Sequence, residues 1–133
     1  MKNVIKVLFY FKYIYYIDVR PAIKLIRIST LADMKFDLKY LDYDQKIILN
    51  DIVKICGGMI FNKDYRVDGE KVYLVASKKM YRFKKDDIRK DLEKYSFYIL
   101  INERFILDTY YFLTNLKENI NDPEYKYDDD EFY

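Results

Sequence analysis

The sequence of 133 residues has no histidine, no tryptophan and a single cysteine, Cys56. Without histidine, the Ser-His and Cys-His pairs of nucleophilic enzymes are excluded, as are metal sites built on imidazole. One cysteine cannot form an intramolecular disulfide, nor supply the ligands of a usual zinc site. Cys56 falls at a predicted helix C-terminus, where the helix dipole disfavours a thiolate, so we expect it to be buried and structural.

Glycine and proline are also scarce, with three and two copies. The chain has no Walker-type glycine loop and no GxGxxG fingerprint for nucleotide binding. The acidic run at 128–130 predicts a solvated, disordered segment in preference to a set of metal ligands. We therefore expect no catalytic residue, no metal site and no cofactor bound by this chain itself.

The residues that are abundant indicate one globular domain from an AT-rich genome. Hydrophobic residues make up 51% and charged residues 35% of the chain, which is typical of a folded protein. Lys, Ile, Tyr, Asn and Phe, whose codons are AT-rich, supply 66 of the 133 residues. A virus, a virus-like plasmid or a parasite would have such a genome.

The net charge of +2 hides an asymmetry along the chain. Residues 121–133 carry −5, so the first 120 residues carry +7. We predict a compact domain over 1–120 and an acidic, flexible tail over 121–133. A basic body suits a polyanionic partner, and the tail could compete for it or dock elsewhere. The alternative is an ordinary solvated charged surface.

The N-terminal run from Val4 to Ile17 is the most apolar stretch. It has 14 residues and two interrupting lysines, whereas a membrane-spanning helix needs about 20 apolar residues. We expect a cytoplasmic protein with no membrane contact, whose N-terminal helix is buried against a partner. The candidate interface residues in this run are Val4, Val7, Leu8, Phe9, Phe11, Ile14 and Ile17.

The pattern along the chain predicts an α+β fold. Two N-terminal helices, at 4–16 and 18–29, precede an irregular stretch at 30–41; the Tyr, Phe and Ile content of 4–16 also permits a strand there. A helix then begins after Asp42, which forms a capping box with Gln45, and it ends at Gly57 and Gly58.

An apolar run starts at 59–61. The Asp68-Gly69 pair after Arg66-Val67 then predicts a β-hairpin within a small antiparallel sheet, with its second arm at 71–76. A helix at 86–95, a strand at 96–102 and a C-terminal helix at 106–120 complete the prediction.

A basic segment between Ser77 and Lys85 contains two aromatic residues, Tyr81 and Phe83. Lysine and arginine neutralise phosphates and aromatic rings stack on bases, so this segment is a candidate nucleic-acid contact. The alternative is that both aromatic residues are core strand residues. The candidate contacts are Lys78, Lys79, Arg82, Lys84 and Lys85.

The helix at 43–58 resembles one near the C-terminal end of the largest subunit of multisubunit RNA polymerases, through Tyr43, Leu49, Asp51, Ile52, Gly57 and Gly58. The similarity extends upstream to Val4–Leu8 and to the segment from Ile17 to Ile26. Together with the AT-rich composition, the chain resembles the small polymerase subunits of the cytoplasmic linear killer plasmids of yeasts.

The resemblance implies a non-catalytic subunit of a DNA-directed RNA polymerase, in a heterodimer with a large fused subunit. It implies that catalytic Mg²⁺ is held by that partner and that DNA and RNA are contacted indirectly. Within the helix, Tyr43, Ile48 and Ile52 are candidate interface residues. The alternatives are a stand-alone nucleic-acid-binding protein of a mobile element and a viral inhibitor of a host protein.

Overall fold

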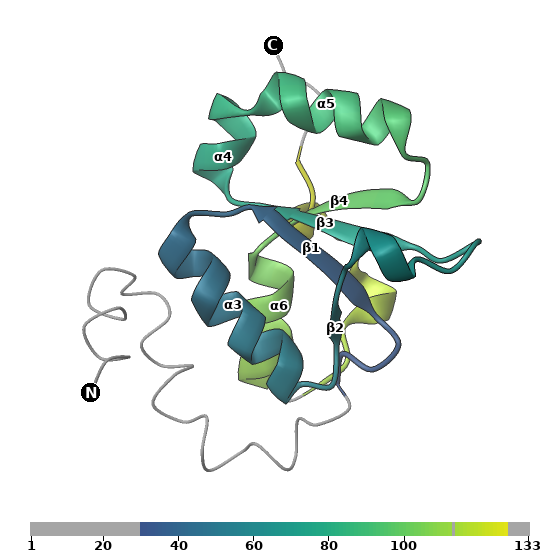
Figure 1. The fold of residues 1–133 in the computed structure, drawn as a ribbon. Coiled ribbons are helices and arrows are strands. Elements are labelled where there is room, and N and C mark those ends of the chain that lie inside the picture. The colour runs from purple at the N-terminus through teal and green to yellow at the C-terminus, as the bar shows by residue number, and fades with distance from the viewer. Residues whose placement is uncertain (1–29, 113, 128–133) are drawn as a thin grey trace.

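The computed structural model describes residues 30–112 and 114–127, which fold around a four-stranded sheet (Figure 1). The predicted N-terminal helices and their seven interface residues lie outside the described residues. The elements in chain order are β1 (Lys35–Tyr40), α3 (Tyr43–Ile55), β2 (Met59–Ile60), β3 (Val72–Ala76), α4 (Lys78–Phe83), α5 (Lys85–Lys94), β4 (Tyr98–Asn102) and α6 (Arg104–Phe112). Single 3₁₀ turns are η2 (Lys63–Tyr65), η3 (Lys117–Asn119) and η4 (Pro123–Tyr125).

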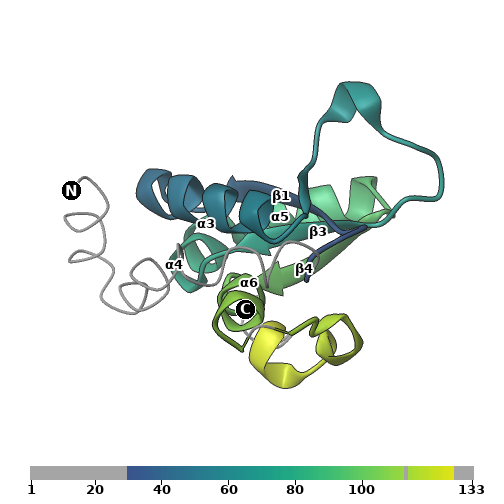
Figure 2. The same ribbon diagram turned by 90° about the horizontal axis from the view of Figure 1, so that it is seen from below.

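The sheet has the order β2-β1-β3-β4 and every strand pair is parallel. Helices α3 and α6 pack together on one face, and α4 and α5 cover the other (Figures 1 and 2). The predicted mixture of helices and strands is confirmed, but the predicted antiparallel arrangement is wrong. Parallel neighbours need crossover connections, and helices supply them between β1 and β2 and between β3 and β4.

The predicted hairpin at Asp68-Gly69 is a turn without a hairpin. The Glu70 N–H donates to the Val67 carbonyl over 3.2 Å, and Gly69 has φ +82°. The strands on either side do not pair with each other, because both β2 and β3 pair with β1. The local turn chemistry was therefore readable from the sequence, whereas the strand pairing depended on β1.

Strand β1 lies where an irregular segment was predicted. Its side chains alternate strictly, with Phe36, Leu38 and Tyr40 buried and the residues between them partly exposed. This period of two is the sequence signal for a strand. It forms here in the middle of the sheet because β2 and β3 provide hydrogen-bonding partners on both sides.

Helix α3 has the predicted capping box between Asp42 and Gln45, and Cys56 is fully buried at its C-terminal end, as predicted. The two glycines that follow serve different purposes. Gly57 has φ +82°, a conformation that costs other residues strain. Gly58 instead allows close packing, because an added Cβ would lie 3.0 Å from Val53 Cγ1 and 3.2 Å from Leu31 Cβ.

The C-terminal helix is shorter than predicted and the chain then folds back. Helix α6 ends at Phe112, and η3 and η4 follow in place of the predicted last turns to Ile120. Ile120 and Tyr125 are both buried, at 8% and 6% exposure. For both side chains to reach the main core, the chain has to reverse its direction after α6. The burial of these side chains is therefore achieved by a turn, although the spacing of the apolar residues favoured a longer helix. Packing therefore extends beyond residue 120, into the predicted flexible tail.

Candidate nucleic-acid interface

Polar and charged residues meet at the carboxyl edge of the sheet, where β1 and β3 end side by side. In open parallel sheets this edge is the usual ligand-binding side, at the point where the strand order reverses. Asp42 follows β1, and Ser77 and Lys78 follow β3. The Lys79 Nζ lies 3.8 Å from Asp42 Oδ1, so one cation at this edge is already paired.

Helix α4 carries Lys78, Lys79 and Arg82 of the basic segment, while Lys84 is its C-cap and Lys85 begins α5. Ser77 caps α4 by accepting the Met80 N–H at 3.2 Å, and Tyr81 is fully buried against the sheet. This orientation exposes the remaining cations to solvent. Among the residues that the structure describes, Lys78, Arg82 and Lys84 make no ion pair. The exposed side chains of this surface, the α4 cationic face, are Lys78, Lys79, Arg82 and Lys84, with Lys85 half-buried beside them.

The two aromatic residues of the basic segment have opposite environments. Tyr81 is a core residue, as one sequence interpretation expected, although it belongs to a helix and not to a strand. Phe83 is 76% exposed, which leaves its ring free to contact a partner. The ring of Tyr81 stacks on that of Tyr127, with centroids 3.9 Å apart and planes 8° apart.

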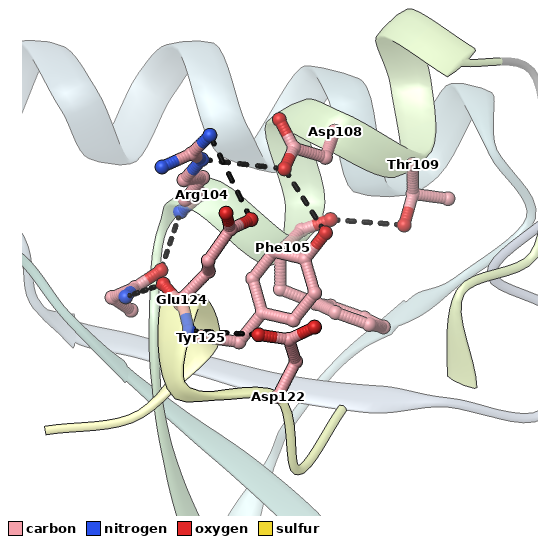
Figure 3. A network of polar contacts seen from close by, with 8 residues as sticks. Arg104, Phe105, Asp108, Thr109, Asp122, Glu124 and Tyr125 are labelled. Carbon is pink, nitrogen blue, oxygen red and sulfur yellow. Dashed lines mark hydrogen bonds and ion pairs between the residues drawn. The ribbon is translucent and has the colours of Figure 1, made fainter. Parts of the chain in front are cut away.

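The segment that carries Tyr127 is fixed to α6 by the polar network in Figure 3. Asp108, 7% exposed, accepts the Tyr125 hydroxyl at 3.0 Å, and Arg104 Nε lies 3.4 Å from the same oxygen. The Asn102 side chain donates to the Glu124 carbonyl at 2.6 Å. Burial and the Asp108 hydrogen bond raise the pKa of Tyr125 above its usual range, so it remains a donor at neutral pH.

The attachment of the segment around Tyr125 to α6 was not predicted from the sequence, because residues 121–133 were interpreted as one acidic run. A signal was present in the aromatic residues Tyr125 and Tyr127, which follow an Asp122-Pro123 turn. Such a turn begins η4, where Asp122 accepts the Glu124 N–H.

Under α5, charged groups in the sheet are paired internally. The hydroxyl of Tyr40 donates to Asp91, and Lys39 Nζ lies 2.8 Å from the same carboxylate. Burial alone would raise the pKa of Asp91, but these two hydrogen bonds hold it below its usual value. Similarly, Tyr98 donates to Asp37 at 2.5 Å. These carboxylates therefore serve the structure by holding α5 and β4 to β1.

The interface candidates in α3 do not share one surface. Tyr43 is 77% exposed and remains available to a partner. Ile48 and Ile52 are 3% and 0% exposed because they pack in the chain's own core, so they present no surface and are corrected here to core residues.

The described residues contain no group of three or more His, Cys, Asp or Glu side chains that could hold a metal ion. Within 30–112 and 114–127, no helix is both long and apolar enough to cross a bilayer.

The fold and site define a mixed α/β protein with an open parallel sheet and a cationic helix at one side. Comparison with protein-family models, curated proteins and solved structures gives no match.

Proposed function

We propose that this chain is a non-catalytic nucleic-acid-binding subunit whose α4 cationic face contacts the phosphate backbone. The observation that carries the proposal is the clustering of five cations within eight residues around the buried Tyr81. Of these five cations, only Lys79 forms an ion pair with an acidic side chain of the described residues. Mostly exposed cations gathered on and just after one short helix favour binding of a polyanion, whose condensed counterions they displace.

The shape of this face favours contact with backbone over reading of base sequence. Helix α4 has six residues, about 9 Å of length, and its inner side is fixed to the sheet by Tyr81. Such a helix can lie along phosphates, whereas sequence reading needs side chains that reach base edges in a groove. The exposed Phe83 ring adds a surface for stacking on an unpaired base.

A DNA-directed RNA polymerase is the assembly in which we propose that the subunit works. The support is the resemblance of the α3 segment, together with the end of that helix at Gly57 with φ +82°. In this proposal the chain completes a large fused subunit in the cytoplasm and supports transcription. The partner carries the catalytic Mg²⁺.

Fluorescence anisotropy with a labelled 20-mer, single-stranded and duplex, tests the nucleic-acid contact at several salt concentrations. A variant with Lys78, Lys79, Arg82 and Lys84 changed to Gln should bind more weakly. Its log K against log[salt] slope should fall by about 3 to 4 for duplex, since each phosphate contact contributes about 0.9.

The matched control changes four exposed lysines on other elements to Gln: Lys46, Lys54, Lys63 and Lys117. It has the same net charge as the α4 variant, so equal slopes in the two variants would show a diffuse charge effect and overturn the α4 proposal.

The polymerase assembly is tested by purifying the tagged chain from its host at high salt. A stoichiometric large subunit with polymerase motifs is expected, and recovery of the chain alone would reject that setting.

A further inference from the structure

Strand β2 forms an open edge of the sheet in the part of the chain that the structure describes. It has only two residues, and β1 is its only neighbour there. The N–H groups on either side of Ile60, those of Met59 and Phe61, donate to β1 carbonyls at 3.0 and 2.8 Å. Because backbone groups alternate in direction along a strand, the N–H and C=O of Ile60 face away from β1. Ile60 therefore presents a donor and an acceptor on the outer side of the sheet.

The opposite edge of the sheet, at β4, is covered by the chain itself. There, Lys126 Nζ donates to the Leu100 carbonyl at 3.3 Å, and the Asn102 side chain donates to the Glu124 carbonyl at 2.6 Å. Within 30–112 and 114–127, no side chain makes such a bond to the backbone of Ile60. Strand edges of this kind are ready to pair with another chain.

Two hollows, of about 400 and 460 Å³, lie along the β2 edge, and Ile60 lines both of them. Together they form a groove, the β2-edge groove, beside α3, which packs against both β1 and β2. Helix α3 contributes Lys46 and Asn50 to one hollow and Lys54 to the other. Since residues four apart share one side of a helix, these three side chains form a polar stripe along the groove.

The β2-edge groove combines exposed apolar side chains with unpaired cations. Met59 is 48% exposed, and Tyr65, which lines the same hollow, is 76% exposed. Lys46 and Lys54 form no ion pair with the described residues, whereas the other two lysines of the lining are already paired with acids. The only acid in the described lining, Asp37, already accepts a tyrosine hydroxyl. Two cations therefore remain for the acids of a partner.

We infer that the β2-edge groove binds an extended segment of a partner polypeptide, which pairs with Ile60 and sets two acidic side chains against Lys46 and Lys54. Strand addition of this kind is a common mode of peptide recognition. The two lysines lie eight helical residues apart, or about 12 Å, and four residues of an extended strand span about 13 Å. The segment should therefore carry acids four positions apart, with an apolar residue midway between them on the same face.

A second copy of this chain fits the groove less well. In a two-fold contact the same surface meets itself, so Lys46 and Lys54 would face the identical lysines of the other copy. An acidic segment of a different polypeptide has the complementary charge. The inference does not rest on the proposed nucleic-acid contact, because the β2-edge groove and the α4 cationic face share no residue.

The test ligand is the end-capped peptide Thr-Glu-Thr-Val-Thr-Glu-Thr, titrated into the isotope-labelled chain and followed by NMR. The signals of Ile60 and of the α3 stripe should shift, and the Ile60 amide hydrogen should exchange more slowly in the complex. The same peptide with lysine in place of both glutamates should bind about fivefold more weakly, as expected for two exposed ion pairs. A peptide methylated on two successive central nitrogens loses a backbone donor in either register and should bind about tenfold more weakly.

Reversing the charge of the groove wall tests the role of the two lysines. In the variant with Lys46→Glu and Lys54→Glu, the lysine peptide should bind more tightly than the glutamate peptide. The matched control, Lys90→Glu with Lys117→Glu, has the same net charge and changes exposed lysines on other elements. It should keep the native preference, and a reversal in both variants would show a general charge effect and overturn the assignment to the groove.

Four other results would also overturn the inference. If neither peptide shifts the Ile60 signal, the short strand and its lysines serve only to keep the edge from pairing. If the peptide binds while exchange of the Ile60 amide is unchanged, no strand is added. A chain that sediments as a dimer and binds the peptide only after dissociation has a second copy in the groove. Displacement of the peptide by the 20-mer would assign the groove to nucleic acid.

Discussion

Replacing Gly58 by alanine tests the packing at the end of α3, where the chain passes closest to the segment before β1. An alanine Cβ would lie 3.0 Å from Val53 Cγ1, 3.2 Å from Leu31 Cβ and 3.3 Å from the Leu31 carbonyl oxygen. Leu31 cannot withdraw freely, since it is fully buried and its N–H donates to the Cys56 carbonyl at 2.9 Å. The Gly58 N–H also donates to the Val53 carbonyl at 2.9 Å, so the backbone is held on both sides.

The expected magnitude follows from two opposing terms. Overpacking a fixed site costs about 1–3 kcal/mol, because backbone or side chains must shift. Loss of unfolded-chain entropy on changing Gly to Ala favours the folded state by about 0.4–1 kcal/mol. Gly58 is outside the positive-φ region, so no backbone strain is added. The net destabilisation of Gly58→Ala should be about 1–2 kcal/mol.

Gly69→Ala provides the comparison, because it isolates the backbone term. Gly69 has φ +82° but a Cβ there would meet nothing within 4 Å, so its cost should be conformational strain of about 1 kcal/mol. Urea unfolding followed by circular dichroism measures both variants. A Gly58→Ala chain as stable as the native one would refute the packing argument. Val53→Ala removes the Cγ1 that an added Cβ would approach most closely, so Gly58→Ala should cost less in the Val53→Ala background than in the native chain.

Three further variants test other parts of the structure. Tyr125→Phe leaves the buried Asp108 carboxylate without its hydroxyl donor and should cost about 1–3 kcal/mol in urea unfolding, whereas an unchanged midpoint would reject the attachment of this segment to α6. In the Asp91→Asn variant, the free energy of unfolding should fall less on acidification than it does in the native chain. The lowered pKa of Asp91 contributes stability that is present above its unfolded pKa of about 3.9 and is lost as pH falls through the folded value, as unfolding between pH 2 and 7 would show. Ile52→Ala should cost about 2–5 kcal/mol, with a shift much smaller than this contradicting its assignment to the core.

Local signals in the sequence predicted local structure well. The capping box of Asp42 and Gln45, the stop at Gly57 and the burial of Cys56 all depend on a few neighbouring residues, and each is confirmed. Helix α5 and strand β4 were likewise predicted within about two residues of their bounds. In each case the hydrophobic periodicity and the flanking residues favour the same local structure, so that structure does not depend on a particular tertiary contact.

Sheet topology was not predictable in the same way. The turn at Gly69 formed as expected, but a turn does not determine which strand its arms pair with. Once 30–41 was interpreted as irregular, β1 was missing and an antiparallel hairpin was the only pairing left. Phe36, Leu38 and Tyr40 stand at every second position and are buried in the structure, so this alternation in the sequence would have identified the central strand. A helix between successive strands then favours a parallel sheet.

The candidate site combines one predictable part and one that required the structure. The cations of α4 were visible as a basic segment, but only the burial of Tyr81 shows which side of the helix faces solvent. The place of Tyr127 on that ring could not be read from spacing, since the two residues lie 46 positions apart in the sequence. This long-range contact joins the segment after η4 to the inner, buried side of α4.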